Sequence, residues 1–378
     1  MTPTSTPSSW STERAHWHSF YANTLTNQID RLISRVSTSK TKHETLIPHF
    51  ESILMVFERG ILHPDPTTRL RLLELVRTLH PLPIWWGKWA AWMYILKKAI
   101  NIAQSEGKRH HQIWFQLRQA EMLLSTGNGE KAFALSESAY EVAQEENEYE
   151  MAFHAEMLMF DTQKYLGHIQ NPQNDLESLE RSFTWTRQRV PQKTAQELEI
   201  HFSLKKSVVL QRQGYHQNAL DSSRKALQCS KKVFQKTDYV MAQIHSRLGG
   251  SYWAKNDHEN AIKHLEQAKE IFQFWGDQTS QIDAMGDMGL IYWRAAQYNK
   301  AERVLKKSVN MAEEINAWRW QTSQTGDLGL VYFSQGKLPK AVALMDQHYN
   351  LAVQTDNHTE AERANGNRAI ACLYMGNF

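Results

Sequence analysis

Apolar residues recur along most of the chain at the spacing of an α-helix. In one segment, Ala261, Leu265, Ala268 and Phe272 follow one another at intervals of four, three and four residues, with mostly polar residues between them. This spacing places the apolar side chains on one face of a helix, whereas a strand would alternate apolar and polar residues. The pattern therefore predicts an all-α protein.

The same order of residues returns every 40 residues in the second half of the chain. The segments 246–253, 286–293 and 326–333 each contain a glycine and, three residues later, a tyrosine. An alanine follows each segment at a fixed distance. These residues are Gly249, Gly289 and Gly329; Tyr252, Tyr292 and Tyr332; and Ala261, Ala301 and Ala341. A fixed period of this length predicts a solenoid in which each repeat is a helix, a short turn and a second helix.

Weaker copies extend the repeat in both directions. Upstream, copies surround Gly214 and Gly127, a degenerate copy covers 166–183, and the earliest has its turn at Gly87 and its second helix over 89–104. A further copy begins at Gly366 and stops at residue 378. We therefore predict a solenoid of antiparallel helix pairs with about six to seven repeats, the last incomplete, and a chain that is a fragment of a longer protein. This solenoid covers 81–378.

The region before the repeats has a different pattern. Residues 1–9 are rich in Pro, Ser and Thr and predict a disordered tail without the apolar stretch of a signal peptide. Residues 10–80 predict an N-terminal helical adaptor or cap for the solenoid, with Pro66 at a helix start. The three helices expected in it cover 11–35, 42–57 and 65–79.

The repeat resembles the tetratricopeptide repeat, which has Leu-Gly, Tyr, Gly and then two alanines in this order. The best match is Leu328, Gly329, Tyr332, Gly336 and Ala341, with His348 in place of the second alanine. The resemblance implies a right-handed superhelix whose first helices line a concave groove for a protein or peptide.

The 40-residue period is similar to the sensor arms of bacterial STAND-type signalling ATPases. The segments 85–99 and 14–21 resemble the first arm repeat and the helix that follows the ATPase in such proteins. No GxxxxGK[ST] phosphate loop occurs in the sequence. This resemblance implies a sensor module without its motor, and an effector domain or C-terminal continuation outside this chain.

Composition narrows the function classes further. The formal net charge is +3 and no run of Lys or Arg exceeds two residues, unlike the dense basic stripe of a nucleic-acid-binding domain. Two cysteines fit a reducing compartment, and we expect a cytoplasmic protein. The most apolar stretch, 83–96, contains Lys88 and is shorter than the ~20 residues of a membrane-spanning helix. No membrane partner is expected.

The register of the repeats selects candidate ligand-binding residues on the first helices. They are Gln243, Asp283 and Ser323; Arg247, Asp287, Asp327 and Asn367; and Gly250, Leu290 and Leu330. Acidic and apolar residues dominate this set, so a clamp of Lys, Asn and Arg for a C-terminal carboxylate is disfavoured. An alternative is that the polar residues hydrogen-bond within the array. The aromatic residues Trp253, Trp293 and Phe333 are expected to pack between repeats.

No catalytic constellation appears. The sequence contains no HExxH, GxSxG or Gly-rich phosphate loop, and its 17 histidines are scattered. We expect a non-enzymatic protein without cofactor or metal.

Three functions follow in order of preference. The first is a regulatory scaffold or sensor that binds a protein or peptide. The second is the small-ligand-sensing arm of a regulator, using the tryptophans within 85–92 and 318–320. The third is nucleic-acid binding through dispersed basic residues, which are Arg69, Arg71, Arg77, Lys97, Lys98, Lys108 and Arg109.

Overall fold

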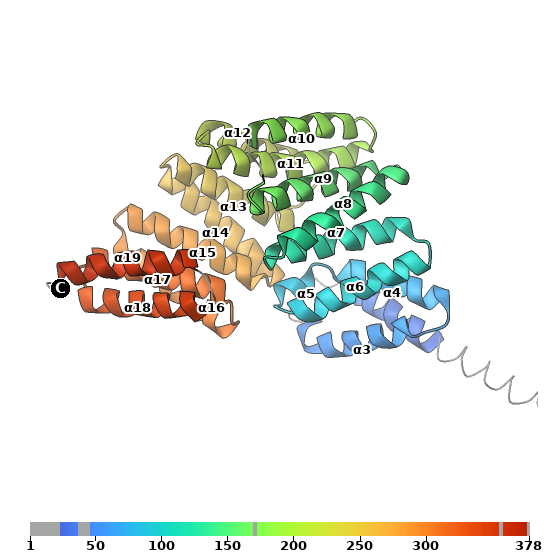
Figure 1. Ribbon diagram of the computed structural model, residues 1–378, viewed down its shortest axis with the longest axis horizontal. Helices are drawn as coiled ribbons and strands as arrows, with labels where there is room; N and C mark the ends of the chain where they lie inside the picture. Colours follow the sequence, from blue (N-terminus) through green and yellow to red (C-terminus); the bar gives the residue numbers. More distant parts are fainter. Residues whose placement is uncertain (1–22, 37–45, 169–171, 355–357, 376–378) are drawn as a thin grey trace, which may run out of the picture. The chain divides into compact units, whose positions relative to one another are not determined.

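A computed structural model describes residues 23–36, 46–168, 172–354 and 358–375 of the protein. The chain divides into two compact units, Met1–Val190 and Pro191–Phe378. All regular elements in the described ranges are helices, as Figure 1 shows. The predicted all-α repeat solenoid is therefore confirmed. The expected tail 1–9 and the segment 14–21 lie outside the described residues.

The first unit begins with a helix over 23–36. Its further elements are η1 (Ile47–His49), α3 (Phe50–Ile61), α4 (Pro66–Leu79), α5 (Leu82–Trp85), α6 (Trp89–Ser105), α7 (Arg109–Ser125), α8 (Gly129–Glu145), α9 (Tyr149–Tyr165) and α10 (Pro172–Thr186). The expected helix over 65–79 agrees with α4 to one residue, because Asp65 caps it and Pro66 starts it. The helix expected over 42–57 is found later, as η1 and α3.

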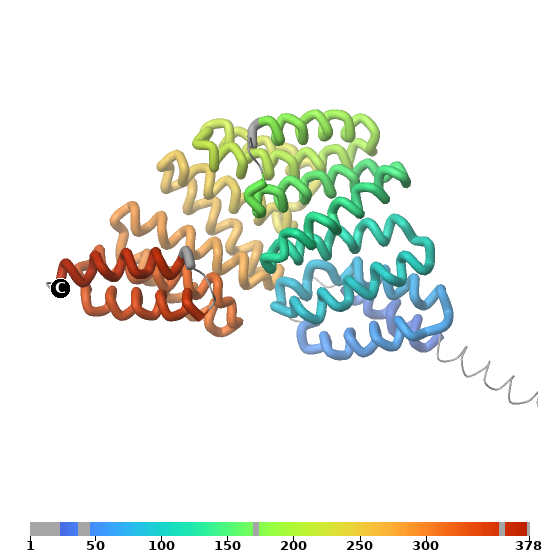
Figure 2. Tube along the Cα trace, viewed as in Figure 1, coloured from blue at the N-terminus to red at the C-terminus, as the bar shows by residue number. Residues whose placement is uncertain are grey.

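The second unit consists of nine described helices in one continuous order. They are α11 (Gln192–Arg212), α12 (His216–Ser230), α13 (Tyr239–Ala254), α14 (His258–Trp275), α15 (Gln278–Arg294), α16 (Tyr298–Glu314), α17 (Trp318–Ser334), α18 (Leu338–Gln354) and α19 (His358–Tyr374). Successive helices pack against each other, and the first helices α13, α15, α17 and α19 also contact one another. The tube in Figure 2 shows this alternation of helix and short turn within each unit.

A residue with left-handed backbone follows the end of most helices, at intervals of 20 residues. In the first unit these residues are Gly87, Gly107, Gly127, Asn147 and Gly167; in the second unit they are Asn256, Gly276, Ala296, Asn316 and Gly336, while Gly214 stands outside this spacing. Glycine and asparagine adopt this conformation at low cost and end helices for that reason. Because these residues are equally spaced, the helices between them are similar in length. Two such helices per repeat give the period of 40 residues.

The repeated glycines allow the two helices of a repeat to approach closely. A methyl group at Gly249 would lie 2.6 Å from Leu265 Cγ, and one at Gly289 would lie 2.5 Å from Leu305 Cγ. Both leucines are fully buried beside the alanines that begin the second helices. In these two repeats, a leucine of the second helix therefore packs directly on the backbone of the first helix.

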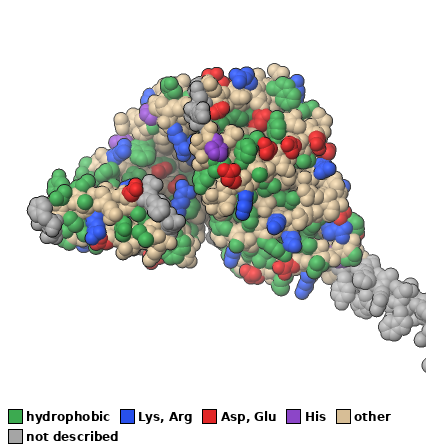
Figure 3. Space-filling view, in the orientation of Figure 1, with side chains coloured by type: hydrophobic (Ala, Val, Ile, Leu, Met, Phe, Trp, Pro, Cys, Tyr) green, Lys and Arg blue, Asp and Glu red, His purple; other side chains and the backbone are tan. Residues whose placement is uncertain are grey.

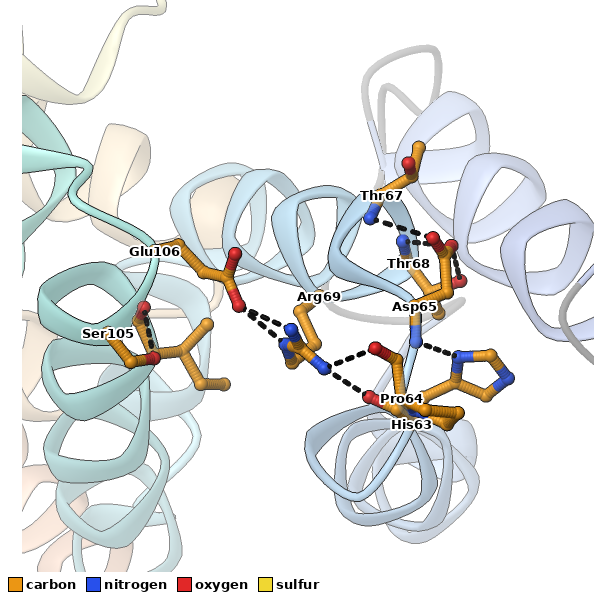
Figure 4. Close-up of polar contacts among 9 residues, drawn as sticks. His63, Pro64, Asp65, Thr67, Thr68, Arg69, Ser105 and Glu106 are labelled. Atoms are coloured by element: carbon orange, nitrogen blue, oxygen red, sulfur yellow. Dashed lines mark hydrogen bonds and ion pairs between the residues drawn. The ribbon is translucent and has the colours of Figure 1, made fainter.

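In the first unit, Arg69 connects three segments (Figure 4). Its Nη1 donates to the main-chain oxygens of His63 at 2.6 Å and Pro64 at 2.9 Å, and its Nε donates to Glu106 Oε1 at 2.8 Å. Glu106 is the C-terminal cap of α6. The guanidinium thus joins the start of α4 and the α3–α4 turn to the end of α6.

Ala296 is the one left-handed position of the second unit occupied by neither glycine nor asparagine, with φ of 56°. A β-carbon in this conformation costs roughly 1–2 kcal/mol. We expect Ala296→Gly to raise the free energy of unfolding by about 0.5–1 kcal/mol, because the relief exceeds the added entropy of the unfolded chain. The control is Ala295→Gly, at φ of −78°, which should lower stability. Equal losses in urea unfolding of both variants would contradict this expectation.

Arg69→Lys should destabilise the region around α4, because an ammonium group cannot replace the fork that reaches two carbonyls and a carboxylate. The expected loss is about 1–3 kcal/mol. Amide hydrogen exchange of residues 66–79 measures it. Arg71→Lys is the matched control, since Arg71 is about half exposed and its ion pairs among the described residues are with exposed Asp30 and Glu74. This control substitution should change the free energy of exchange of residues 66–79 by less than about 0.5 kcal/mol.

Candidate ligand-binding face of the second unit

The candidate residues lie on adjacent first helices of the second unit. Gln243 and Arg247 are on α13, Asp283, Asp287 and Leu290 on α15, Ser323, Asp327 and Leu330 on α17, and Asn367 on α19. Because these helices contact one another and share a register, residues 40 apart occupy equivalent positions. We call the surface formed by these nine residues the first-helix face.

Exposure differs along the first-helix face. Gln243, Arg247 and Asp283 are exposed, whereas Asp287, Ser323 and Asn367 are partly buried. Leu330 packs against the apolar cluster of the last repeats. Asp327 is only 4% exposed, so the face is open at α13 and α15 and closed at α17.

An ion-pair network closes the face at α17. Arg363 of α19 donates from Nη1 to Asp327 Oδ1 at 3.3 Å and from Nη2 to the main-chain oxygen of Ser323 at 3.1 Å. Its Nη2 also lies 2.8 Å from Glu360 Oε2. Burial raises the pKa of Asp327 to about 6, although Arg363 opposes the shift. For Asp327, pairing within the array is therefore what the structure shows.

His348 anchors this network from α18. The imidazole is fully buried and its Nε2 donates to Glu360 Oε2 at 2.8 Å, which lowers the pKa of Glu360. A methyl group at Gly326 would lie 2.5 Å from His348 Nδ1. The substitution of histidine for the repeat alanine thus requires glycine on the facing helix.

Asp287 has no such partner. Among the described residues, no hydrogen bond or ion pair reaches its carboxylate. Burial raises the pKa of Asp287 to about 7; the charge of Asp283 raises it further, Arg247 lowers it and Asp327 raises it. The carboxylate is thus surrounded by more negative than positive charge.

Trp320 and Gln324 of α17 face the same part of α15. Trp320 Nε1 donates to Asp283 Oδ1 at 3.2 Å. Gln324 Nε2 donates to the main-chain oxygen of Ile282 at 2.9 Å. The other amide atom of Gln324, Oε1, is buried without a partner among the described residues. Two groups near the stretch 282–287 therefore lack donors among the described residues: Gln324 Oε1 of α17 and the Asp287 carboxylate of α15.

The other candidate clusters belong to packing. His245 and His264 meet Nδ1 to Nδ1 at 2.9 Å, and burial lowers the pKa of His245 to about 4. The described residues contain no group of three or more His, Cys, Asp or Glu that could hold a metal ion. Trp85 and Trp92 of the proposed aromatic site are buried, and Trp92 Nε1 donates to His80. Neither cluster favours a metal or small-ligand site.

On the face drawn in Figure 3, basic and acidic side chains are interspersed and form no continuous basic stripe among the residues shown in colour. No helix within the described ranges is long and apolar enough to cross a membrane.

Sequence reasoning missed three residues that shape the site, Arg363, Glu360 and Gln324. The sequence could have indicated Arg363, because this residue stands 40 residues after Ser323 in the same register. The substitution at His348 was visible too, since Ala268 and Ser308 precede it at intervals of 40. Gln324 gives no signal in the sequence, because its role depends on a contact between helices.

Comparisons with known proteins identify the repeat family. The tetratricopeptide repeat family matches residues 240–314. The chain carries tetratricopeptide repeats. The matched residues cover α13 to α16, and α13 and α15 carry Gln243, Arg247, Asp283, Asp287 and Leu290 of the first-helix face. No curated protein matches the sequence.

Solved tetratricopeptide and related structures share the fold. RapI in its apo form has a TM-score of 0.56 at 14% identity, covering 70% of this chain and 72% of RapI. A STAND protein with a tetratricopeptide repeat sensor from Pyrococcus horikoshii has a TM-score of 0.56 at 16% identity. The match covers 87% of this chain and 50% of the STAND protein. A Rap protein complexed with Competence and Sporulation Factor has a TM-score of 0.52 at 14% identity, covering 94% and 99%. These likenesses show the fold of the repeats.

Replacing Asp287 by asparagine should change stability in a pH-dependent way. Native Asp287 keeps its proton up to about pH 7, whereas the unfolded chain ionises near pH 4, so its contribution to stability falls as pH rises between these values. We expect Asp287→Asn to equal the wild type at pH 4 and to exceed it by about 1–3 kcal/mol at pH 8. Urea unfolding at both pH values tests this. Glu314→Gln, at an exposed position of α16, is the control and should show no such difference.

Proposed function

We propose that this chain is a non-catalytic, protein-interaction module of a regulatory protein, and that its second unit binds a segment of a partner on the first-helix face. The observation that carries the proposal is the unpaired Asp287 carboxylate beside exposed Asp283 and Arg247. Polar groups that remain unpaired at a partly buried position are costly in the free protein. A partner that supplies donors offsets this cost.

The comparisons support a regulatory role of the binding. One similar structure is a Rap protein in complex with Competence and Sporulation Factor, and another is a STAND protein with a repeat sensor. This chain spans half the length of the latter. By analogy, binding on the first-helix face would control an effector located elsewhere.

Site-directed photocrosslinking tests the proposal in cells. A photoreactive amino acid at Gln243, exposed on the first-helix face, should capture a partner protein. The matched control carries it at Glu270, which is exposed on the second helix α14. A peptide from the captured region should bind the purified protein, and Trp320→Ala should weaken it at least tenfold, as expected for an aromatic contact residue. Capture from Glu270 alone, or an unchanged affinity with Trp320→Ala, would refute the assignment of the face.

A further inference from the structure

The structure contains an internal example of how the first-helix face binds a guanidinium group. Arg363 bonds to Asp327, 36 residues before it, and to the main-chain oxygen of Ser323, 40 residues before it. One repeat earlier, the residue equivalent to Arg363 is Ser323, and the equivalents of Asp327 and Ser323 are Asp287 and Asp283. The same acceptors recur there, but serine is too short to fill them.

We infer that Asp287 and Asp283 bind the guanidinium group of an arginine side chain from a partner segment. The inference rests on the proposed function and deepens it by naming the chemistry of the partner. The arginine of the partner would take the place that Arg363 takes at the next repeat.

The unmatched atoms at this position are acceptors, which favours a donor with several N–H groups. Asp287 has no partner among the described residues, and the only bond that these residues give to Asp283 comes from Trp320. Gln324 Oε1 of α17 is a further buried acceptor without a partner among the described residues, and its residue is 3% exposed. Guanidinium offers five donors in a planar fork and remains charged at every relevant pH.

A positive charge is required as well as donors. Asp287 faces Asp283 on its own helix, Asp327 on α17 and Arg247 on α13. Arg247 is exposed and forms no ion pair with Asp287 in the structure, and Asp327 is already paired with Arg363. A neutral donor would leave the repulsion between the carboxylates in place, whereas a cation offsets it.

Trp320 provides the remaining contact. At the next repeat its position holds Glu360, which binds Arg363 directly. Trp320 replaces that carboxylate by an indole ring, held by its bond to Asp283, and aromatic faces attract guanidinium groups. The ring already receives the guanidinium of Arg319, whose Cζ lies 5.7 Å from the ring centroid, so Trp320 can make a contact of this kind.

A substitution within the chain tests the site without a ligand. Ser323→Arg would place a guanidinium beside Asp287 as Arg363 lies beside Asp327. We expect it to raise the melting temperature at pH 8, and to lose this effect in an Asp287→Asn background. Ser323→Gln, which has a long uncharged side chain, is the control. A rise that is the same in both backgrounds, or the same for glutamine, would overturn the inference.

Ligand binding is tested with the capped pentapeptide Ala-Ala-Arg-Ala-Ala and its citrulline counterpart, using 5-fluorotryptophan NMR of the full chain. Trp320→Phe assigns the reporter signal. We expect the arginine peptide to shift that signal saturably at pH 8, and citrulline to leave it unchanged. Binding should be about tenfold weaker at pH 6, because Asp287 must lose its proton to pair. It should be lost in Asp287→Asn and in Ser323→Arg.

Two results separate this inference from the proposed function. If the arginine peptide causes no shift at 10 millimolar, or citrulline shifts the signal equally, the guanidinium site is refuted. Partner capture from Gln243 would then still support the first-helix face. If the peptide binds as expected but no partner is captured from Gln243, the site stands and the proposed function fails.

Discussion

The rest of the structure depends on the left-handed residue that ends a helix every 20 residues. Glycine or asparagine occupies this position in nearly every turn, and Ala296 shows that the conformation is kept even where the residue disfavours it. Equal helices keep one register from repeat to repeat. Leu265 and Leu305 therefore meet Gly249 and Gly289 in the same way, and residues 40 apart present their side chains in one row.

Because the register is constant, the residues at equivalent positions of successive repeats can be compared directly. His348 replaces a small residue and is accommodated because Gly326 has no side chain. Once buried there, it holds Glu360, and Glu360 with Asp327 holds Arg363. The last repeats are thus tied together by an ion-pair network that starts at a position where the earlier repeats have Ala268 and Ser308.

Buried polar groups are satisfied at some positions of the fold and left without a partner at others. In the first unit, Arg69 satisfies its donors with two carbonyls and Glu106. In the second unit, Gln324 Oε1 is buried without a donor among the described residues, and the carboxylate of partly buried Asp287 receives no hydrogen bond from them. Unmatched groups of this kind cost stability in the free protein, and proteins retain them where a ligand completes the set.

The sequence by itself determined the helices, the 40-residue period and the register, because these follow from apolar spacing and from turn residues close to each other in the chain. It located α4 to one residue, yet it misplaced the helix before it, where capping signals are weak. Only the tertiary structure decided that Asp327 has a cation and Asp287 has none. The difference depends on whether the side chain 36 residues after the aspartate, Arg363 or Ser323, reaches the carboxylate. It also depends on how much water the neighbouring helices exclude. Neither the contact nor the burial can be read from a local sequence pattern.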